Sequence, residues 1–144
     1  MSQHQQCQVS NLEDVERIYR KWDEALAKND AEGLLALYAP DAVLESPLIP
    51  DLMGSEVGIC RGHAELRPFF EKLASRKPQI RRYYRTGYLT EGKILMWEYP
   101  RATLYGEQMD FVEVMELQEG LIQQHRVYWG WRGFEVIKKN EYPR

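Results

Sequence analysis

The sequence predicts one α+β domain, a cone-shaped barrel in which a curved antiparallel or mixed β-sheet is covered by three α-helices from the first half of the chain. Apolar residues recur at helical spacing in the first half, and four long segments rich in β-branched and aromatic residues fill the second half. The chain of 144 residues is long enough for one hydrophobic core and too short for two ordinary domains. We therefore treat residues 1–144 as a single domain.

The first helix is predicted to begin at Ser10. Ser10 and Glu13 form a capping-box pattern, in which each side chain satisfies a free N–H group at the start of a helix. Residues 1–9 are then a polar tail. The apolar positions that follow are three and four residues apart and give the helix one buried stripe; they are Leu12, Val15, Ile18, Tyr19, Trp22, Ala25 and Leu26.

A second, short helix follows. Asn29 and Asp30 break the first helix and provide a new N-cap. The second helix ends before Pro40, because a proline disfavours helical backbone in the residue that precedes it. Its apolar residues are Leu34, Leu35, Leu37 and Tyr38.

A strand, a loop and a third helix complete the first half of the chain. Residues 42–45 are short and apolar, as expected for a strand, and residues 46–61 hold the prolines and glycines typical of a loop. Residues 63–76 repeat apolar side chains at helical spacing. A loop as long as the one predicted here can cover a pocket.

The composition of the second half of the chain predicts an antiparallel meander followed by a tail. Short turns that contain glycine join four segments of strand-forming composition, namely residues 80–88, 94–104, 109–117 and 121–131. Residues 134–144 are charged. We expect them to form a surface extension whose only apolar anchors are Val136 and Ile137.

The charge balance argues against a nucleic-acid partner. The net charge is −3 and the sequence pI is near 5.7, so the chain lacks the broad positive field that binding to a phosphate backbone requires. One basic run, residues 81–85, alternates between the two faces of a predicted strand. We interpret this run as an outward basic edge.

The sequence also predicts a cytoplasmic protein without membrane contact. The N-terminal residues lack the basic start and apolar stretch of a signal peptide, and nowhere do about eighteen apolar residues follow one another. Two cysteines, Cys7 and Cys60, do not make a disulfide framework. The three histidines at positions 4, 63 and 125 share no metal-binding spacing, and we expect no metal and no cofactor.

Helices laid on the concave face of a curved sheet leave a cavity between the two layers. We expect this cavity to bind a small hydrophobic molecule. The side chains expected to line it are mostly aromatic, because one helix alone cannot fill such a space. They are Trp22, Tyr19, Tyr38, Ser46, Phe70, Trp97, Phe111, Val127 and Trp129.

Three stretches carry a resemblance to a known family: LLALYAPDAVLESP at 34–47, RGHAELRPFFEKL at 61–73 and VEVMELQEGLIQQHRVYW at 112–129. With the order of predicted elements, they resemble the nuclear transport factor 2-like superfamily, particularly its SnoaL-like and ketosteroid-isomerase-like members, over about residues 12–131. The superfamily includes cyclases, dehydratases, epoxide hydrolases and non-catalytic binders, so the resemblance implies a fold and leaves the reaction open.

The resemblance also implies roles for single residues. The proton-shuttling aspartate of the isomerase stands before the proline that follows the first strand, and here Ser46 holds that place, with Glu45 one residue earlier. The oxyanion-donating tyrosine of the isomerase corresponds to Trp22, whose N–H group can donate a hydrogen bond but cannot take up a proton. The protonated acid of the isomerase corresponds to Glu113. The chain therefore resembles that scaffold without its general base.

The turn at Glu119-Gly120 decides which side chains share the cavity. A three-residue loop with Gly120 as a left-handed bulge avoids positive φ at Glu119 and places Glu113 opposite His125. Since side chains alternate along a strand, one face then carries Glu113, His125, Val127 and Trp129.

In this register Glu113 and His125 are the predicted catalytic pair, because a carboxylate that fixes the tautomer of an imidazole is suited to proton transfer. A two-residue loop would instead place Glu113 beside Arg126 and Tyr128, as in an ordinary cross-strand ion pair. The alternative roles are a half-exposed histidine with one hydrogen bond for His125, and a solvated outward glutamate for Glu113.

Glu45 is the third candidate for catalysis. It follows Leu44, so it takes the opposite face of the strand or the mouth of the cavity. There it is either a displaced general base at the cavity rim or the ion-pair partner of a basic neighbour such as Arg61.

These features leave three classes of function. The leading hypothesis is a small enzyme that performs acid–base chemistry, such as isomerisation, cyclisation or dehydration, on a hydrophobic ring-containing or polyketide-like metabolite. The second is a non-catalytic module that binds a small ligand. The third is association into a homodimer through the outer face of the sheet, where Val112, Val114 and Tyr128 are expected.

Overall fold

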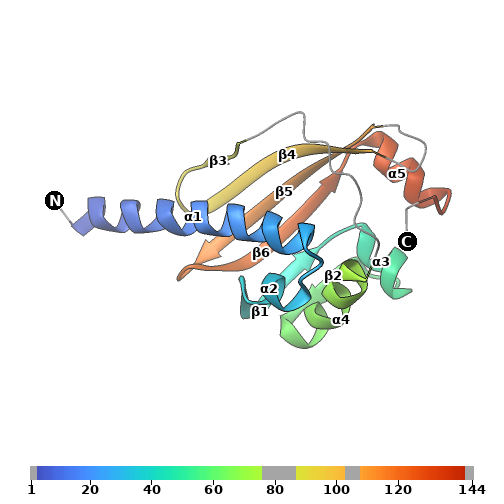
Figure 1. The fold of residues 1–144 in the computed structure, drawn as a ribbon, viewed down its shortest axis with the longest axis horizontal. Coiled ribbons are helices and arrows are strands. Elements are labelled where there is room, and N and C mark those ends of the chain that lie inside the picture. Colours follow the sequence, from blue (N-terminus) through green and yellow to red (C-terminus); the bar gives the residue numbers. More distant parts are fainter. Residues whose placement is uncertain (1–2, 76–86, 103–107, 142–144) are drawn as a thin grey trace.

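A curved sheet of six strands carries the fold (Figure 1). The computed structural model describes residues 3–75, 87–102 and 108–141. The strand order is β2-β1-β6-β5-β4-β3, and the pairing of β1 with β6 is parallel while the other pairings are antiparallel, so the sheet is mixed. The strands are β1 (Tyr38–Glu45), β2 (Ile59–Arg61), β3 (Leu89–Thr90), β4 (Ile94–Ala102), β5 (Gln108–Gln118) and β6 (Leu121–Trp129).

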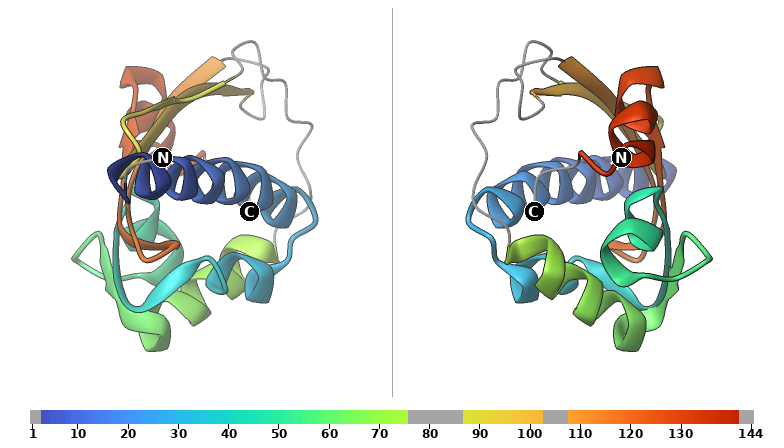
Figure 2. Two further views of the ribbon diagram at one scale, coloured as in Figure 1. Left: turned by 90° about the vertical axis from the view of Figure 1, so that its left-hand side faces the viewer. Right: turned by 90° about the vertical axis from the view of Figure 1, so that its right-hand side faces the viewer.

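Helices cover the concave side of this sheet, which curves around the long first helix without closing into a barrel (Figure 2). The second and fourth helices pack together beside β1, and the last helix packs on β5 and β6 at the far end. None of the helices in the described ranges is long and apolar enough to cross a membrane. The helices are α1 (Gln3–Ala27), α2 (Ala31–Leu35), α3 (Leu48–Met53), α4 (Gly62–Ala74) and α5 (Trp131–Lys138).

The α+β class and the curved mixed sheet are as predicted, whereas the start of α1 is not. The helix begins at Gln3, so the predicted start at Ser10 and the tail over residues 1–9 are wrong. No glycine or proline interrupts the residues before Ser10, and glutamine is a good helix former, so the helix continues through the capping-box pattern. The predicted apolar stripe is confirmed, since Val15 and Ile18 are fully buried.

The second helix is shorter than predicted. Asp30 is its N-cap, as expected, and the Asp30 carboxylate accepts a hydrogen bond of 2.9 Å from the Gly33 N–H group. The helix ends at Leu35, and Tyr38 is the first residue of β1. Assignment of Tyr38 to the helix was therefore wrong, because pairing of β1 with Ile122 of β6 determines its backbone conformation.

The predicted loop over residues 46–61 contains two short elements. Helix α3 lies between Pro47 and Gly54, and Gly54 adopts a positive φ of 65° that ends the helix. Strand β2 then pairs with β1 and brings Cys60 opposite Leu44. The prolines and glycines that indicated a loop thus bound a short helix. The predicted third helix is confirmed as α4.

Three strands of the predicted meander are confirmed as β4, β5 and β6. Most of the predicted strand at residues 80–88, with the basic run at residues 81–85, lies outside the described residues. The predicted surface extension is wrong in its first part, because residues 131–138 form the amphipathic helix α5. Val136 anchors this helix and is fully buried, and a side chain added at Gly133 would collide with the Trp129 ring.

The β5–β6 hairpin differs from the predicted register. Gln118 pairs with Leu121, so the loop has two residues, and Glu119 and Gly120 adopt positive φ values of 52° and 77°, typical of a type I′ turn. An extra residue in β6 at Gln123 then shifts the pairing. Glu113 lies opposite Val127 and diagonal to His125, rather than opposite His125. The pairing is shifted by two residues from the predicted one, so the cavity face keeps the same side chains.

Glu119→Asn is expected to stabilise the protein. Glutamate adopts positive φ reluctantly, whereas asparagine is favoured in type I′ turns. We expect the free energy of unfolding to rise by about 0.5–1 kcal/mol in urea denaturation. Glu119→Ala serves as the matched control, because alanine gains nothing at positive φ. An asparagine variant no more stable than the alanine variant would contradict the assigned turn.

Candidate active site

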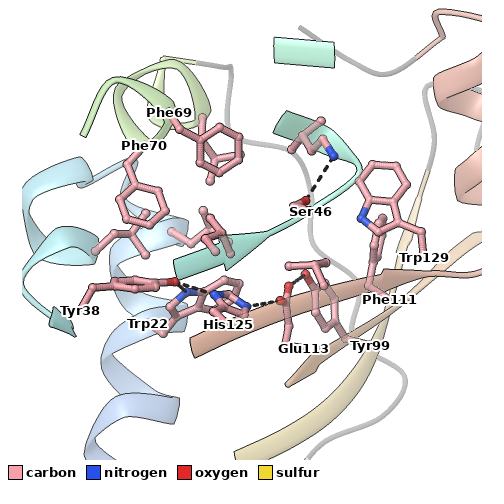
Figure 3. A pocket seen from close by; sticks show the side chains of 16 residues that line it. Trp22, Tyr38, Ser46, Phe69, Phe70, Tyr99, Phe111, Glu113, His125 and Trp129 are labelled. Atoms are coloured by element: carbon pink, nitrogen blue, oxygen red, sulfur yellow. Dashed lines mark hydrogen bonds and ion pairs between the residues drawn. The ribbon is translucent and has the colours of Figure 1, made fainter. Parts of the chain in front are cut away.

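A partly open cavity lies between the helices and the sheet (Figure 3). About 510 Å³ of space is free of protein atoms, part of it open to solvent. Most of the side chains predicted to line the cavity do so: Trp22, Tyr38, Ser46, Phe70, Phe111, Val127 and Trp129. The sequence-based prediction missed Leu26, Leu34, Leu44, Leu48, Phe69, Leu73 and Tyr99.

Tyr19 and Trp97 were predicted to line the cavity and do not. Their rings pack edge to face, with centroids 5.3 Å apart, and Trp97 makes a similar contact with Trp22. Helix α1 therefore covers this part of the concave sheet face. Tyr99 is also aromatic and lies two residues after Trp97 on the same strand, so strand alternation gives the two side chains the same face.

Glu113 and His125 meet at the cavity wall. Their side chains are only 3% and 2% exposed, and the Glu113 Oε2 atom lies 2.6 Å from the His125 Nε2 atom. The Tyr99 hydroxyl donates to Glu113 Oε1 over 2.7 Å. Burying a carboxylate is unfavourable unless donors satisfy it, and these two partners supply that compensation. The predicted pairing of Glu113 with His125 is thus observed as a contact.

The hydrogen-bond chain continues from His125 towards α1. The Tyr38 hydroxyl lies 2.7 Å from His125 Nδ1, and Trp22 Nε1 donates to that hydroxyl over 3.2 Å. Figure 3 shows Trp22, Tyr38, His125 and Glu113 as one continuous row. We call these four residues and Tyr99 the polar row. Each of the five residues comes from a different element, namely α1, β1, β4, β5 and β6. The row therefore forms only when the helix and the strands have come together.

An irregularity in β1 brings Tyr38 to this row. Tyr38 pairs with Ile122 and Val43 pairs with Gln124, so four residues of β1 bulge against one residue of β6. His63 contacts the start of the bulge, where its Nε2 atom lies 2.9 Å from the Tyr38 carbonyl oxygen. The backbone of Gly62 also lies close to the bulge. A Cβ atom at this position would come within 3.2 Å of the Pro40 carbonyl oxygen, and the φ of +72° also favours glycine.

A sequence profile of the SnoaL-like domain matches residues 19–125, which is most of the chain and includes the polar row from Trp22 to His125. This chain belongs to the SnoaL-like domain family. No curated protein matches the sequence significantly.

Solved structures share the fold of this SnoaL-like domain at low sequence identity. An NTF2-like protein of unknown function from Burkholderia pseudomallei is 18% identical, with a TM-score of 0.67 over 86% of this chain and 96% of its own. A putative ketosteroid isomerase from Kribbella flavida is 24% identical, with a TM-score of 0.60 over 82% and 78%. A steroid delta-isomerase from Pseudomonas aeruginosa is 16% identical, with a TM-score of 0.65 over 89% and 88%.

The third predicted catalytic residue, Glu45, does not reach the cavity of this SnoaL-like domain. Its side chain is exposed, and within the described residues no ion pair joins it to Arg61. Ser46 does line the cavity and is buried, and its Oγ atom accepts a hydrogen bond of 3.2 Å from the Leu48 N–H group. Strand alternation explains the difference, because Ser46 and Leu44 share the inward face that Glu45 lacks.

The titration of Tyr38 is shifted by its surroundings. Burial raises the pKa of its hydroxyl well above the ordinary value, the hydrogen bond from Trp22 lowers this pKa by less, and the nearby Glu113 charge adds a still smaller increase. Tyr38 therefore keeps its proton at neutral pH. In the described part of the chain, no group of three histidine, cysteine, aspartate or glutamate side chains is placed to hold a metal ion.

Tyr38→Phe is expected to make the SnoaL-like domain less sensitive to alkali. Above about pH 10 the unfolded chain releases the Tyr38 proton while the folded chain retains it, so this contribution to stability is complete below that pH and is lost as the pH rises. The wild-type free energy of unfolding should fall by roughly 1.4 kcal/mol more per pH unit than that of the variant. Thermal denaturation between about pH 8 and pH 11 measures this difference.

Phe134→Leu is the control, because it changes an exposed ring that carries no titrating group. It should follow the wild-type pH dependence. Parallel curves for wild type and Tyr38→Phe would show that the Tyr38 hydroxyl is not held protonated by the fold.

Proposed function

We propose that this SnoaL-like domain is an enzyme that carries out acid–base chemistry, such as isomerisation, cyclisation or dehydration, on a hydrophobic ring-containing or polyketide-like metabolite. The observation that supports this proposal is the buried contact of 2.6 Å between Glu113 and His125 at the wall of an apolar cavity. A carboxylate held beside a bound substrate is placed to act as a general base.

Glu113 is the proposed base. It takes a proton from a carbon next to a substrate carbonyl group, and the electron pair of the broken C–H bond moves onto the carbonyl oxygen. Ser46, whose buried hydroxyl lines the same cavity, donates a hydrogen bond to that oxygen. Return of the proton from Glu113 to a different carbon completes an isomerisation. In a dehydration the carbonyl re-forms, the bond between the β-carbon and its hydroxyl oxygen breaks, and Glu113 gives its proton to that oxygen, which leaves as water.

His125 keeps Glu113 in place during this cycle. Its Nε2–H group donates to one carboxylate oxygen while Tyr99 donates to the other, so the carboxylate plane is fixed from both sides. Two of the structures with this fold are described as ketosteroid or steroid isomerases, which supports proton transfer on an apolar ring compound. The base of this chain then comes from β5 instead of the end of β1, where Ser46 stands.

Glu113→Gln and His125→Gln are each expected to abolish catalysed proton exchange. The assay follows exchange of the acidic ring protons of 2-tetralone, an enolisable ring ketone, into deuterated water by nuclear magnetic resonance. General base catalysis contributes roughly 10²- to 10⁴-fold, so loss of the base should lower the rate over buffer by that factor. His125→Ala should have the same effect, with added loss of stability from the cavity that it leaves.

Glu24→Gln is the control, since this glutamate is exposed on α1 outside the cavity. Circular dichroism should show that all variants are folded. Full exchange activity in folded Glu113→Gln protein would end the proposal of this base.

A binding module without catalysis is the second candidate. It is favoured by the polar row itself, because both nitrogens of His125 and both oxygens of Glu113 already have partners within the protein. A ligand that co-purifies with the chain and returns unchanged after long incubation, together with no exchange above buffer, would support this second function.

The proposal also includes a homodimer through the outer sheet face. Tyr128 is 54% exposed there and lies opposite Val112, whose neighbour on the same face, Val114, is opposite Arg126. Tyr128→Glu should convert a dimer to a monomer in light scattering after size exclusion. Phe134→Glu, at an equally exposed aromatic on α5, should leave the dimer intact. A wild-type monomer would refute this association.

A further inference from the structure

The direction of each hydrogen bond in the polar row can be assigned from its Trp22 end. An indole N–H group only donates, so the Tyr38 oxygen is the acceptor in their contact of 3.2 Å. The Tyr38 hydrogen must therefore point elsewhere. The Tyr38 side chain is 1% exposed, and within the described residues its one further partner is His125 Nδ1 at 2.7 Å.

This geometry fixes the tautomer of His125. If His125 Nδ1 carried a hydrogen, the Tyr38 oxygen would receive two donors and its own hydrogen would have no acceptor, which is unfavourable for a buried hydroxyl. With Nδ1 as the acceptor, the ring hydrogen sits on Nε2 and points to Glu113 Oε2. Every donor in the row then has an acceptor, and Glu113 is the carboxylate that receives two of them.

The same assignment determines what the cavity offers a ligand. The hydrogens of Trp22, Tyr38, His125 and Tyr99 are all used within the row, so none remains for a ligand. Glu113 accepts two hydrogen bonds, and a carboxylate has about four acceptor positions. The polar wall at the sheet therefore presents unused acceptors.

The charge of the lining points in the same direction. Among the described residues that line the cavity there is no lysine or arginine, and Glu113 is the one acidic side chain. Within the described lining, a carboxylate or phosphate ligand would meet a negative group and no lysine or arginine, which is unfavourable in an apolar cavity. The Ser46 hydroxyl lines the cavity and can donate a hydrogen bond to an uncharged ligand oxygen.

We propose that the cavity selects an uncharged aromatic or enolic ring compound that bears a hydroxyl group, and that this hydroxyl donates its hydrogen to Glu113. This deepens the proposed function, since it names the substrate class of the same site, and it assigns Trp22 and Tyr38 as positioning residues. They keep the acceptor side of Glu113 open by holding the His125 hydrogen on Nε2.

Three probes with the same ring system test the ligand class: 2-naphthol, 2-methoxynaphthalene and 2-naphthoate. Calorimetry should give a dissociation constant for 2-naphthol that is tenfold or more below that of the methyl ether, because the ether has no hydrogen to donate to the carboxylate. Naphthoate should bind more weakly than naphthol. In Glu113→Gln the preference for naphthol over the ether should fall several-fold, while Glu24→Gln should keep the wild-type preference.

The tautomer is tested separately by nitrogen-15 resonance of the His125 ring. The wild-type spectrum should show a hydrogen on Nε2 and none on Nδ1. Trp22→Phe and Tyr38→Phe remove the constraint and should give a mixture of tautomers. Trp97→Phe, a buried tryptophan that packs against Trp22 outside the row, should keep the wild-type spectrum.

Equal affinity for naphthol and its ether, tighter binding of naphthoate, no binding of naphthol, or a hydrogen on His125 Nδ1 in the wild type would each overturn the inference. These outcomes are independent of turnover. Preferential binding of naphthol without any proton exchange would uphold the inference and remove the proposed enzyme activity. Proton exchange without this preference would do the reverse.

Discussion

The contact between Glu113 and His125 is the constraint on which the rest of the site depends. A carboxylate buried in an apolar wall is stable only if donors satisfy it, and here His125 and Tyr99 lie against Glu113. Satisfying His125 in turn requires Tyr38, and satisfying Tyr38 requires Trp22. The burial of Glu113 is thus linked, through hydrogen bonds, to side chains from α1, β1, β4 and β6. The same elements and β5 carry part of the cavity wall.

The position of β6 explains why this arrangement can form. The strand lies between β1 and β5, so His125 has Leu44 on one side and Met115 on the other, and its ring is shielded from solvent along both. Irregularities in the backbone then place its partners. The bulge at Gln123 sets Glu113 diagonal to His125, and the larger bulge in β1 turns Tyr38 towards the same ring. Tyr38 links His63 to His125, because His63 contacts the Tyr38 backbone carbonyl and the Tyr38 hydroxyl contacts His125.

Among the described residues that line the cavity, the acidic side chain comes from β5. Ser46 follows β1 and lines the cavity, and the side chain of the neighbouring Glu45 is exposed, so the end of β1 brings no acid into the cavity. The acid that remains, Glu113, receives hydrogen bonds from neutral side chains. Each oxygen of Glu113 has one donor within the protein, so the carboxylate has further acceptor positions. The same positions underlie both the proposed base and the proposed ligand class.

The sequence by itself determined the elements and the alternation of side chains. Apolar spacing located the stripe of α1 and the interior of α4, and a composition rich in β-branched and aromatic residues located β4, β5 and β6. The same alternation placed Glu113, His125, Val127 and Trp129 on one face, although the predicted register was wrong, because a shift of two residues preserves the face. For Glu45 this reasoning left two positions open, the face of the strand opposite Leu44 and the mouth of the cavity.

Only the tertiary structure decided which of these side chains touch. The two bulges depend on pairing between segments that lie far apart in the chain, so local patterns could not show that Tyr38 leaves a helix for a strand or that Glu119 accepts a positive φ. The polar row could not be read from spacing for the same reason, since Trp22, Tyr38 and His125 approach one another only when α1 lies across the curved sheet. Hydrogen-bond direction depends on such three-dimensional neighbours, whereas periodicity depends on the chain alone.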